Sequence, residues 1–591
     1  MPAAEHTTFQ LVLVKPSHYD DDGYVIQWIR SAIPSNTMAA IYGIALDCIY
    51  RGVLGPKVTI RVTAYDETNT HVDARKIGRS IRESGGHGLV ALIGVQTNQF
   101  PRAVALASEL MAEGIRSCIG GFHVSGCVAM LPETPADLTD AMNRGISLFA
   151  GELEGRLDTL LTDAYEGTLK PLYDFSAELP NLNDRPPPYL PARVVGRMTE
   201  TRASFDAGRG CPFTCSFCTI INVQGHGSRY RTADDVERII RANVAQGITK
   251  FFITDDNFAR NKAWESHFDR IVELRRELGL DLKLTVQVDT LCHKIPRFIE
   301  KAGAAGVEKV FIGLESINPD ALQGSGKTQN KITEYRAMLQ AWHDVNAVTL
   351  AGYILGFPND TPESILRDIG IIQRELPIDI LEFFILTPLP GSQDHKDLHL
   401  ADAPLDPDMN HYDSTHVTTP HAVMSDAEWL DVYRRAWEAY YTPAHVERVM
   451  RRARRWGTRV DKVKWIMLSY ASISGIERVH PLDGGLFRRK YRRDRRPGLP
   501  LESRAVFYGR FVWDTLRKNA RLARMYFRYQ RTYRRVLAER SPDLSADLAM
   551  QTVRASDLDD LELFTATSAA RSVADRAKRT AALRGDMANV A

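Results

Sequence analysis

The chain has 591 residues, 44% hydrophobic and 25% charged, which is the composition of an ordinary globular protein long enough for two to four domains. It has no apolar run long enough to cross a membrane and no export signal at its start, and its seven cysteines do not suggest a disulfide framework, so we expect a cytoplasmic protein. The net charge of +2 hides an asymmetry, because residues 441–540 hold 27 Lys or Arg against 8 Asp or Glu.

Residues 1–178 alternate short apolar segments with helical patterns. Strands are predicted at Leu11–Lys15, Val58–Val62, Gly88–Gly94 and Ile115–Gly121, with one helix capped by Ser35 and another over Pro101–Glu113. This alternation predicts an α/β domain with a doubly wound, Rossmann-like parallel sheet. Ligands of such sheets bind beyond the carboxyl ends of the strands. Polar side chains and glycines that allow close approach lie there: Thr97, Asn98, Gln99, Gly120, Gly121 and His123.

Residues 179–196 form a proline-rich connector, and a second α/β series occupies residues 197–425. Its predicted strands are Ala203–Ala207, Lys250–Thr254, Leu282–Val288, Lys309–Gly313, Thr349–Leu355 and Leu381–Leu386. Helical patterns separate them, as in Pro362–Glu375. Six such repeats predict a partial, TIM-like (β/α)₆ barrel whose site lies at the carboxyl ends of its strands.

Three cysteines follow the first barrel strand at C-x₃-C-x₂-C spacing: Cys211, Cys215 and Cys218. Three thiolates on one small loop could hold a [4Fe–4S] cluster and leave the fourth iron without a protein ligand. The alternative is a tetrahedral zinc site closed by His226. With Phe217 directly before the last cysteine, the segment resembles the signature loop of the radical S-adenosylmethionine (SAM) superfamily. That resemblance implies that SAM binds the open iron and yields a 5′-deoxyadenosyl radical.

An α/β domain in front of this core, with Gly120-Gly121-Phe122-His123 and Gly151-Glu152-Leu153-Glu154, resembles the cobalamin-binding domain of B12-dependent radical SAM enzymes. The resemblance implies cobalamin contacts at Thr97, Asn98, Gln99, Gly120, Gly121 and His123. Because the sequence has no Asp-x-His-x-x-Gly motif, it implies base-off binding without a protein imidazole on the cobalt.

The same resemblance implies SAM contacts along the barrel, at Phe217, Asp255, Asp256, Gln287, Glu315, Gly352, Ile354 and Gly356. Asp255 or Asp256 would replace the Gly-Gly-Glu-like motif that holds the SAM amino group, since a carboxylate suits an ammonium in a partly dry site. The alternative is a helix-capping pair with Asn257. Asn359 stands where the family has a Glu beyond its Gly-x-Ile-x-Gly element.

Cys292 and Tyr353 are the candidate catalytic side chains, Cys292 as a proton or hydrogen donor. The alternative for Cys292 is a small buried apolar residue.

Residues 426–591 are predicted to form a basic helical module in which aromatic residues alternate with arginines. The run 488–496 carries seven positive charges in nine residues. Three interpretations stay open: a solvated helical cap over the barrel, contact with an anionic membrane or lipid substrate, and RNA binding, with nucleic acid the least favoured. The last 25 residues are predicted to be disordered.

The resemblance as a whole implies a methyltransferase acting on an unactivated carbon of a small-molecule or lipid substrate, with an electron donor such as flavodoxin or ferredoxin. One SAM would supply the radical, and methylcobalamin recharged by a second SAM would supply the methyl group. Three alternatives remain: a radical SAM cyclisation or rearrangement, a tRNA methylthiotransferase-like enzyme, and a non-catalytic metal-containing protein that binds nucleic acid or membrane. The methylthiotransferase family carries a further cysteine triad, which Cys48, Cys118 and Cys127 do not resemble.

Overall fold

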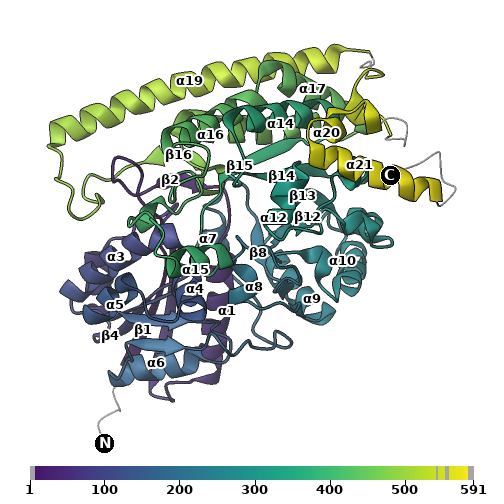
Figure 1. Cartoon of the computed structure of the whole chain (residues 1–591). Helices are drawn as coiled ribbons and strands as arrows, with labels where there is room; N and C mark the ends of the chain where they lie inside the picture. Colours follow the sequence, from purple (N-terminus) through teal and green to yellow (C-terminus); the bar gives the residue numbers. More distant parts are fainter. Residues whose placement is uncertain (1–6, 541–543, 553–557, 584–591) are drawn as a thin grey trace, which may run out of the picture.

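The computed structural model describes residues 7–540, 544–552 and 558–583 (Figure 1). Its N-terminal domain contains a six-stranded, fully parallel sheet in the order β3-β1-β4-β5-β6-β7. The strands are β1 (Thr7–Lys15), β3 (Val58–Asp66), β4 (His87–Leu92), β5 (Ser117–Gly120), β6 (Ser147–Ala150) and β7 (Leu172–Asp174). The strand order reverses between β1 and β4, which is the topological switch point where such sheets bind ligands.

Helices cover both faces of this sheet, which confirms the doubly wound prediction. Alternate residues of β1 point to opposite faces, so that Leu11 and Leu13 enter one core while Val12 and Val14 enter the other. The first core includes α1 (Asn36–Arg51) and α6 (Leu157–Glu166). The second includes α2 (Ala74–Glu83), α3 (Phe100–Ala112), α4 (Phe122–Met130) and α5 (Ala136–Asn143). Ser35 caps α1 as predicted.

The second parallel sheet has six strands in the order β15-β14-β13-β12-β11-β8, and each predicted barrel strand is confirmed. They are β8 (Ala203–Phe205), β11 (Lys250–Ile253), β12 (Lys283–Val288), β13 (Val307–Glu315), β14 (Val348–Leu355) and β15 (Ile380–Ile385). Helices alternate with them: α9 (Ala233–Val244), α10 (Trp264–Leu278), α11 (Phe298–Ala305), α13 (Tyr335–Asp344) and α14 (Pro362–Glu375). Because β8 and β15 are the two edges of the sheet, the barrel is open.

The C-terminal module packs on the barrel. Trp429 and Trp437 of α16 (Asp426–Tyr440) belong to the barrel's own hydrophobic core. The helices α17 (Pro443–Trp456) and α18 (Val460–Ser472) follow, and α19 (Arg504–Ala538) runs along the outer edge of the molecule (Figure 1). The module is therefore a layer built onto the barrel.

The predicted helical character of this module is confirmed, with one strand among its helices: β16 (Gly485–Arg489) pairs antiparallel with β2 (Gln27–Ser31) of the N-terminal domain. The predicted disorder of the last 25 residues is wrong where α21 (Ser568–Leu583) forms a helix, and the rest of that prediction lies outside the described residues. No helix among the described residues has the length and apolar character needed to cross a membrane.

The proline-rich connector lies against the first domain. A Cβ on Gly43 of α1 would come within 2.1 Å of the Pro187 carbonyl oxygen, and the Tyr189 amide donates to Ala39 at 2.9 Å. A second close approach joins α4 to the loop after β15, where a Cβ on Gly126 would lie 2.4 Å from the carbonyl oxygen of Pro390. Both contacts set the barrel firmly against the N-terminal domain.

We expect Gly126→Ala to destabilise the protein, because the added methyl meets backbone atoms that cannot rotate away. Overpacking of this kind costs about 1–3 kcal/mol. Thermal unfolding checks it, with Gly509→Ala as control, since a Cβ there meets open space on α19. An unchanged melting temperature for Gly126→Ala would contradict the close contact between the two domains.

Candidate active site

The three cysteines lie on a loop that a short hairpin closes at its base. Strands β9 (Gly208–Arg209) and β10 (Arg229–Tyr230) pair antiparallel on either side of it. Cys215 is buried, while Cys211 and Cys218 are half-buried. Burial raises the pKa of Cys211, and that of Cys218 to about 12, so these thiols would ionise at neutral pH only with a bound cation.

A second segment, residues 324–329, supports the cysteine loop from the barrel. The Ser216 amide donates to the Ser325 carbonyl at 3.0 Å, and a Cβ on Gly326 would lie 2.7 Å from the Thr214 oxygen. The Gln329 amide donates to the Cys215 sulfur at 3.6 Å. Hydrogen bonds to a ligand sulfur are one means of setting the potential of an iron–sulfur cluster.

Lys327 is a buried cation beside this loop. It is ion-paired with Glu315, and its Nζ lies 5.7 Å from the centre of the Phe217 ring. Burial acts to lower the pKa of Lys327, but the Glu315 carboxylate and the Cys215 sulfur outweigh it and raise the pKa. Glu315 and Phe217 therefore lie on either side of Lys327, and their contact with SAM stays a prediction. Sequence reasoning missed Lys327, although the preceding Gly324-Ser325-Gly326 was a signal for a turn that approaches other backbone closely.

The structure separates the roles of the two adjacent aspartates. Asp255 accepts from the backbone amides of Ala207 and Gly208 at 2.7 and 2.9 Å, and from Asn261 at 2.8 Å, so it organises the strand end. Asp256 lies close enough to Cys211 and Cys218 to raise the pKa of both thiols. Burial raises the pKa of Asp256 itself to about 7. Asp256 is therefore the better placed of the two to receive a cationic group.

The other predicted SAM residues continue along the barrel. Gln287 lines a large cavity and donates to the Asp255 carbonyl at 3.4 Å. Gly356 is required by the fold, because its φ is +101° and a Cβ would lie 1.9 Å from Trp429. Asp360, one residue after the expected position, accepts from the Gly356 amide at 2.9 Å. The adenine contact of Gly352, Ile354 and Gly356 stays a prediction.

Cys292 and Tyr353 are both buried in the hydrophobic core. Burial raises the pKa of Cys292 to about 12, and the Tyr353 hydroxyl donates to Asp368 at 3.3 Å. Neither residue lines the cavity. The structure thus favours the small buried residue alternative for Cys292.

The predicted cobalamin residues gather at the carboxyl edge of the N-terminal sheet. The His123 ring nitrogens lie 2.7 Å from Asp137 and 3.3 Å from Thr97, so the imidazole is engaged on both sides. The base-off binding expected from the sequence stays a prediction. Gly121 lies against its own domain, where a Cβ would meet the Val95 amide at 2.1 Å. Asn98 and Gln99 are buried beside Thr97 in a short 3₁₀ helix, and Gly120 ends β5.

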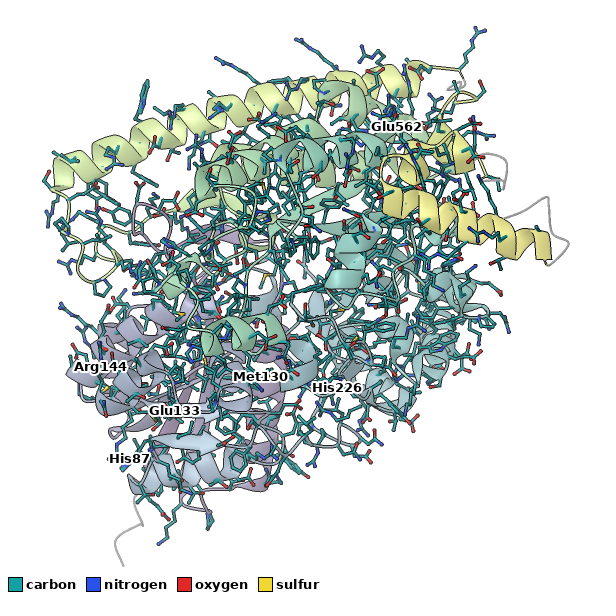
Figure 2. All side chains as sticks on the ribbon, in the orientation of Figure 1. His87, Met130, Glu133, Arg144, His226 and Glu562 are labelled. Atoms are coloured by element: carbon teal, nitrogen blue, oxygen red, sulfur yellow. The ribbon has the colours of Figure 1, made fainter. Side chains whose placement is uncertain are left out.

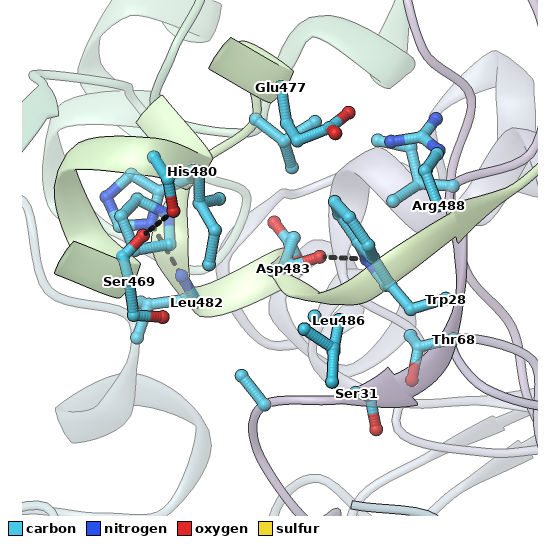
Figure 3. Close-up of a pocket in the computed structure, with 18 of the residues that line it drawn as sticks. Trp28, Ser31, Thr68, Ser469, Glu477, His480, Leu482, Asp483, Leu486 and Arg488 are labelled. Carbon is cyan, nitrogen blue, oxygen red and sulfur yellow. Dashed lines mark hydrogen bonds between the residues drawn. The ribbon is translucent and has the colours of Figure 1, made fainter. Parts of the chain in front are cut away.

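One cavity of about 1740 Å³ lies where the three parts of the chain meet, and Figure 3 shows part of its wall. Ligand pockets usually reach only about 1,000 Å³. Lys15 and Gln99 line it from the two sides of the switch point, and Thr254, Gln287 and Phe311 line it from barrel strands. The cysteines do not line it, but Thr254 directly precedes Asp255 and Asp256. The cavity thus lies between the carboxyl edge of the N-terminal sheet and the barrel strands, and of the predicted cobalamin and SAM residues Gln99 and Gln287 line it.

Two alternatives lose support from the geometry. Within the described residues, no three His, Cys, Asp or Glu side chains are close enough to hold a single metal ion. His226, the suggested zinc ligand, is exposed at the surface (Figure 2). A four-iron cluster needs its thiolates further apart than one ion does. Cys48 and Cys127 belong to cores on opposite faces of the N-terminal sheet, so they form no second triad.

Known proteins share this arrangement. Residues 207–370 match the family model of the radical SAM superfamily. The bacteriochlorophyllide d C-12(1)-methyltransferase of Chlorobaculum tepidum is 28% identical over 330 residues, covering 55% of this chain and 68% of that protein. Over residues 207–370, this chain is similar to the radical SAM proteins. The hopanoid C-2 methylase of Rhodopseudomonas palustris is 27% identical over 195 residues, which cover 32% of this chain and 36% of that protein.

The fold of this chain also resembles that of a solved structure. A structure of the cobalamin-dependent SAM radical enzyme OxsB, with aqua-cobalamin and SAM bound, matches with a TM-score of 0.51 at 13% identity, over 99% of this chain and 84% of that one. The chain is related to the cobalamin-dependent radical SAM methyltransferases, and the predicted family, fold class and enzyme class are confirmed. Because the match spans nearly the whole chain, it includes the C-terminal module.

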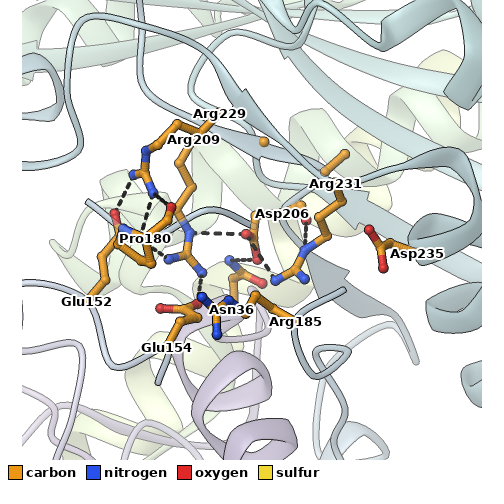
Figure 4. A network of polar contacts seen from close by, with 12 residues as sticks. Asn36, Glu152, Glu154, Pro180, Arg185, Asp206, Arg209, Arg229, Arg231 and Asp235 are labelled. Atoms are coloured by element: carbon orange, nitrogen blue, oxygen red, sulfur yellow. Dashed lines mark hydrogen bonds and ion pairs between the residues drawn. The ribbon is translucent and has the colours of Figure 1, made fainter. Parts of the chain in front are cut away.

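A buried ionic network fixes the cysteine loop of this radical SAM enzyme to its N-terminal domain (Figure 4). Arg209, two residues before Cys211, donates to Asp206 at 3.0 Å, to Glu152 at 2.5 Å and to Glu154 at 2.6 Å. Arg229, on the paired strand β10, also binds Glu152. The two acidic residues that suggested a cobalamin-binding domain therefore hold the base of the loop.

The charges in this network are mutually dependent. Burial acts to raise the pKa of Glu154, but the Arg209 guanidinium outweighs it and holds the pKa below its ordinary value. The same two effects act on Asp206, where Arg231 adds to Arg209. Removing one partner would leave a buried charge without compensation.

We expect Glu154→Gln to lower the free energy of unfolding by about 3 kcal/mol at pH 7, because it breaks a buried pair with Arg209. A carboxylate whose pKa is lowered by folding stabilises above its unfolded pKa, so this loss should shrink as the pH falls below about 4. Urea unfolding of the parent protein and the variant, at pH 7 and at a pH below about 4, measures this loss in the free energy of unfolding. Glu178→Gln, which removes an exposed partner of Arg156, should cost less than about 1 kcal/mol. Equal losses in the two variants would contradict the role of the network.

Proposed function

We propose that this enzyme methylates an unactivated carbon of a large, mainly apolar substrate, using a [4Fe–4S] cluster, SAM and cobalamin. The cavity that joins the switch point of the N-terminal sheet to the barrel strands supports this most directly, because its 1740 Å³ can take more than one large ligand. The curated relatives are named for methyl transfer to bacteriochlorophyllide d and to hopanoids.

The protein's own residues would position the reactants. Cys211, Cys215 and Cys218 would hold the cluster, with Gln329 donating to one sulfur. Lys327 would bind the SAM carboxylate and Asp256 its amino group, both beside the cysteine loop. The bound cofactors supply the radical and the methyl group, and the protein orients them and excludes water.

The cavity wall favours an apolar substrate. Phe252, Phe311, Leu350 and Phe384 enter it from four barrel strands. A ring system or lipid matches such a wall better than a small polar molecule does. The proposal includes a flavodoxin or ferredoxin as electron donor.

Anaerobic purification from cells supplied with cobalamin tests the cofactors. We expect stoichiometric corrinoid in the absorption spectrum, four irons per chain after reconstitution, and 5′-deoxyadenosine from SAM under reductant. Cys215→Ala should abolish the 5′-deoxyadenosine, whereas Cys118→Ala, a buried thiol of β5, should retain it. Methyl transfer would also release S-adenosylhomocysteine, whereas a cyclisation or rearrangement would not. Iron-free protein or absence of 5′-deoxyadenosine would overturn the proposal.

We expect Lys327→Met to weaken SAM binding by roughly 10- to 100-fold while the cluster remains, because a charge-assisted hydrogen bond is worth about 1.5–3 kcal/mol. SAM titration monitored by the spectrum of the reduced cluster measures it. Lys331→Met removes an exposed lysine four residues further on and is the matched control. Equal affinities for the two variants would exclude Lys327 from SAM binding.

A further inference from the structure

The outer face of α19 has no partner among the described residues. With 35 residues, this helix is about 52 Å long. Between Phe507 and Tyr529 none of its residues is buried. It lies as the outermost layer of the molecule, beyond α16 and α17 (Figure 1). A helix that gains so little from core packing presents most of its surface to something outside the fold.

Large apolar side chains gather on this exposed surface. Trp513 is 66% exposed, Leu516 62%, Phe527 59% and Val512 54%. Their spacing of one, three, four or eleven residues along a helix places them on one side of α19, away from Phe507, Phe511 and Tyr529. Side chains of this size are rarely left in water as a contiguous group without an interaction to make.

The same helix is strongly basic. It carries ten Arg or Lys and one acidic residue, Asp514. Six of its arginines form no ion pair with residues 7–540, 544–552 or 558–583: Arg504, Arg521, Arg524, Arg528, Arg531 and Arg534. The basic run at 488–496 is partly paired, because Arg488 and Lys490 bind Asp20, and Arg496 binds Asp408. Helix α19 therefore carries a large share of the charge that is available to an outside partner, together with exposed apolar side chains.

Helix α19 also lines the large cavity, through Phe511, Leu522 and Tyr526, and Phe527 of the exposed group lines it as well. Exposed apolar residues outside α19 also line it: Trp465, Leu482, Leu486 and Phe487. Figure 3 shows Leu482 and Leu486 at this wall. Exposed apolar side chains therefore line the cavity beside a basic, aromatic helix.

We propose that α19 lies on the surface of an anionic phospholipid bilayer and that the cavity receives its substrate from that bilayer. Arginines reach the phosphate groups while Trp, Leu, Phe and Val enter the interface, which is how amphipathic helices bind membranes in the interfacial plane. The helix is too polar to cross the membrane. The membrane contact stands on α19 alone, and only the delivery of substrate rests on the proposed function.

Flotation of the full chain with neutral phosphatidylcholine vesicles and with vesicles containing phosphatidylglycerol tests the contact. We expect binding only to the anionic vesicles. Because each arginine near such a surface contributes about 1 kcal/mol, the triple variant Arg524→Gln, Arg528→Gln, Arg531→Gln should bind at least about tenfold more weakly. The matched control replaces three exposed basic residues of the N-terminal domain, Arg75→Gln, Arg79→Gln and Arg144→Gln, and should bind as the parent does.

A second variant separates a membrane from other anionic partners. Trp513→Ser with Leu516→Ser keeps every charge, and neither residue lines the cavity. It should lose vesicle binding while it still cleaves SAM to 5′-deoxyadenosine. Equal binding to neutral and anionic vesicles, or full binding by either α19 variant, would overturn the proposal. Binding of RNA that needs the arginines but not Trp513 and Leu516 would instead identify a nucleic-acid surface. If the parent protein does not cleave SAM, that result counts against the proposed function and leaves the membrane contact of α19 unaffected.

Discussion

The arrangement of the whole molecule depends on the buried guanidinium of Arg209. Its hydrogen bonds reach Asp206 in the barrel and both Glu152 and Glu154 in the N-terminal domain. Burying an arginine is expensive, and the cost is offset only when each donor finds a carboxylate in the correct geometry. Because the cysteine loop begins two residues later, the relative position of the two domains also fixes the position of the loop.

Because Arg209 holds the two domains in one relative position, both domains line the same cavity. The carboxyl edge of the N-terminal sheet contributes Lys15 and Gln99, and the barrel contributes Thr254 and Gln287. Two α/β units that each bind ligands at the carboxyl ends of their strands therefore open into the same space. The pairing of β16 with β2 then joins the C-terminal module to the N-terminal domain beside this space, and Trp28 of β2 donates to Asp483 at 2.8 Å. A reaction with several large reactants needs such an enclosure.

Periodicity predicted both sheets because buried parallel strands are nearly continuous apolar segments, as in β14, which is buried at every position. The cysteine spacing likewise located the loop. The sequence could not distinguish Asp255 from Asp256, since adjacent residues differ only in what the fold places around each. It also could not reveal Lys327, whose place beside Cys215 comes from a turn that returns to the loop across more than a hundred residues.

The sequence also could not show which charges of the C-terminal module are paired within the fold. The run at 488–496 is the densest basic segment of the sequence, yet the fold pairs three of its seven cations internally, since Asp20 and Asp408 accept the side chains of Arg488, Lys490 and Arg496. Composition counts charges but does not show which ones are already paired. Helix α19 carries more arginines than the nearby carboxylates can pair. The apolar residues between these arginines are exposed, so the helix has both the cationic and the apolar side chains of a membrane-binding surface. These unpaired arginines lie on the same helix as apolar side chains that line the cavity, and we therefore place the arrival of the substrate on the side of α19.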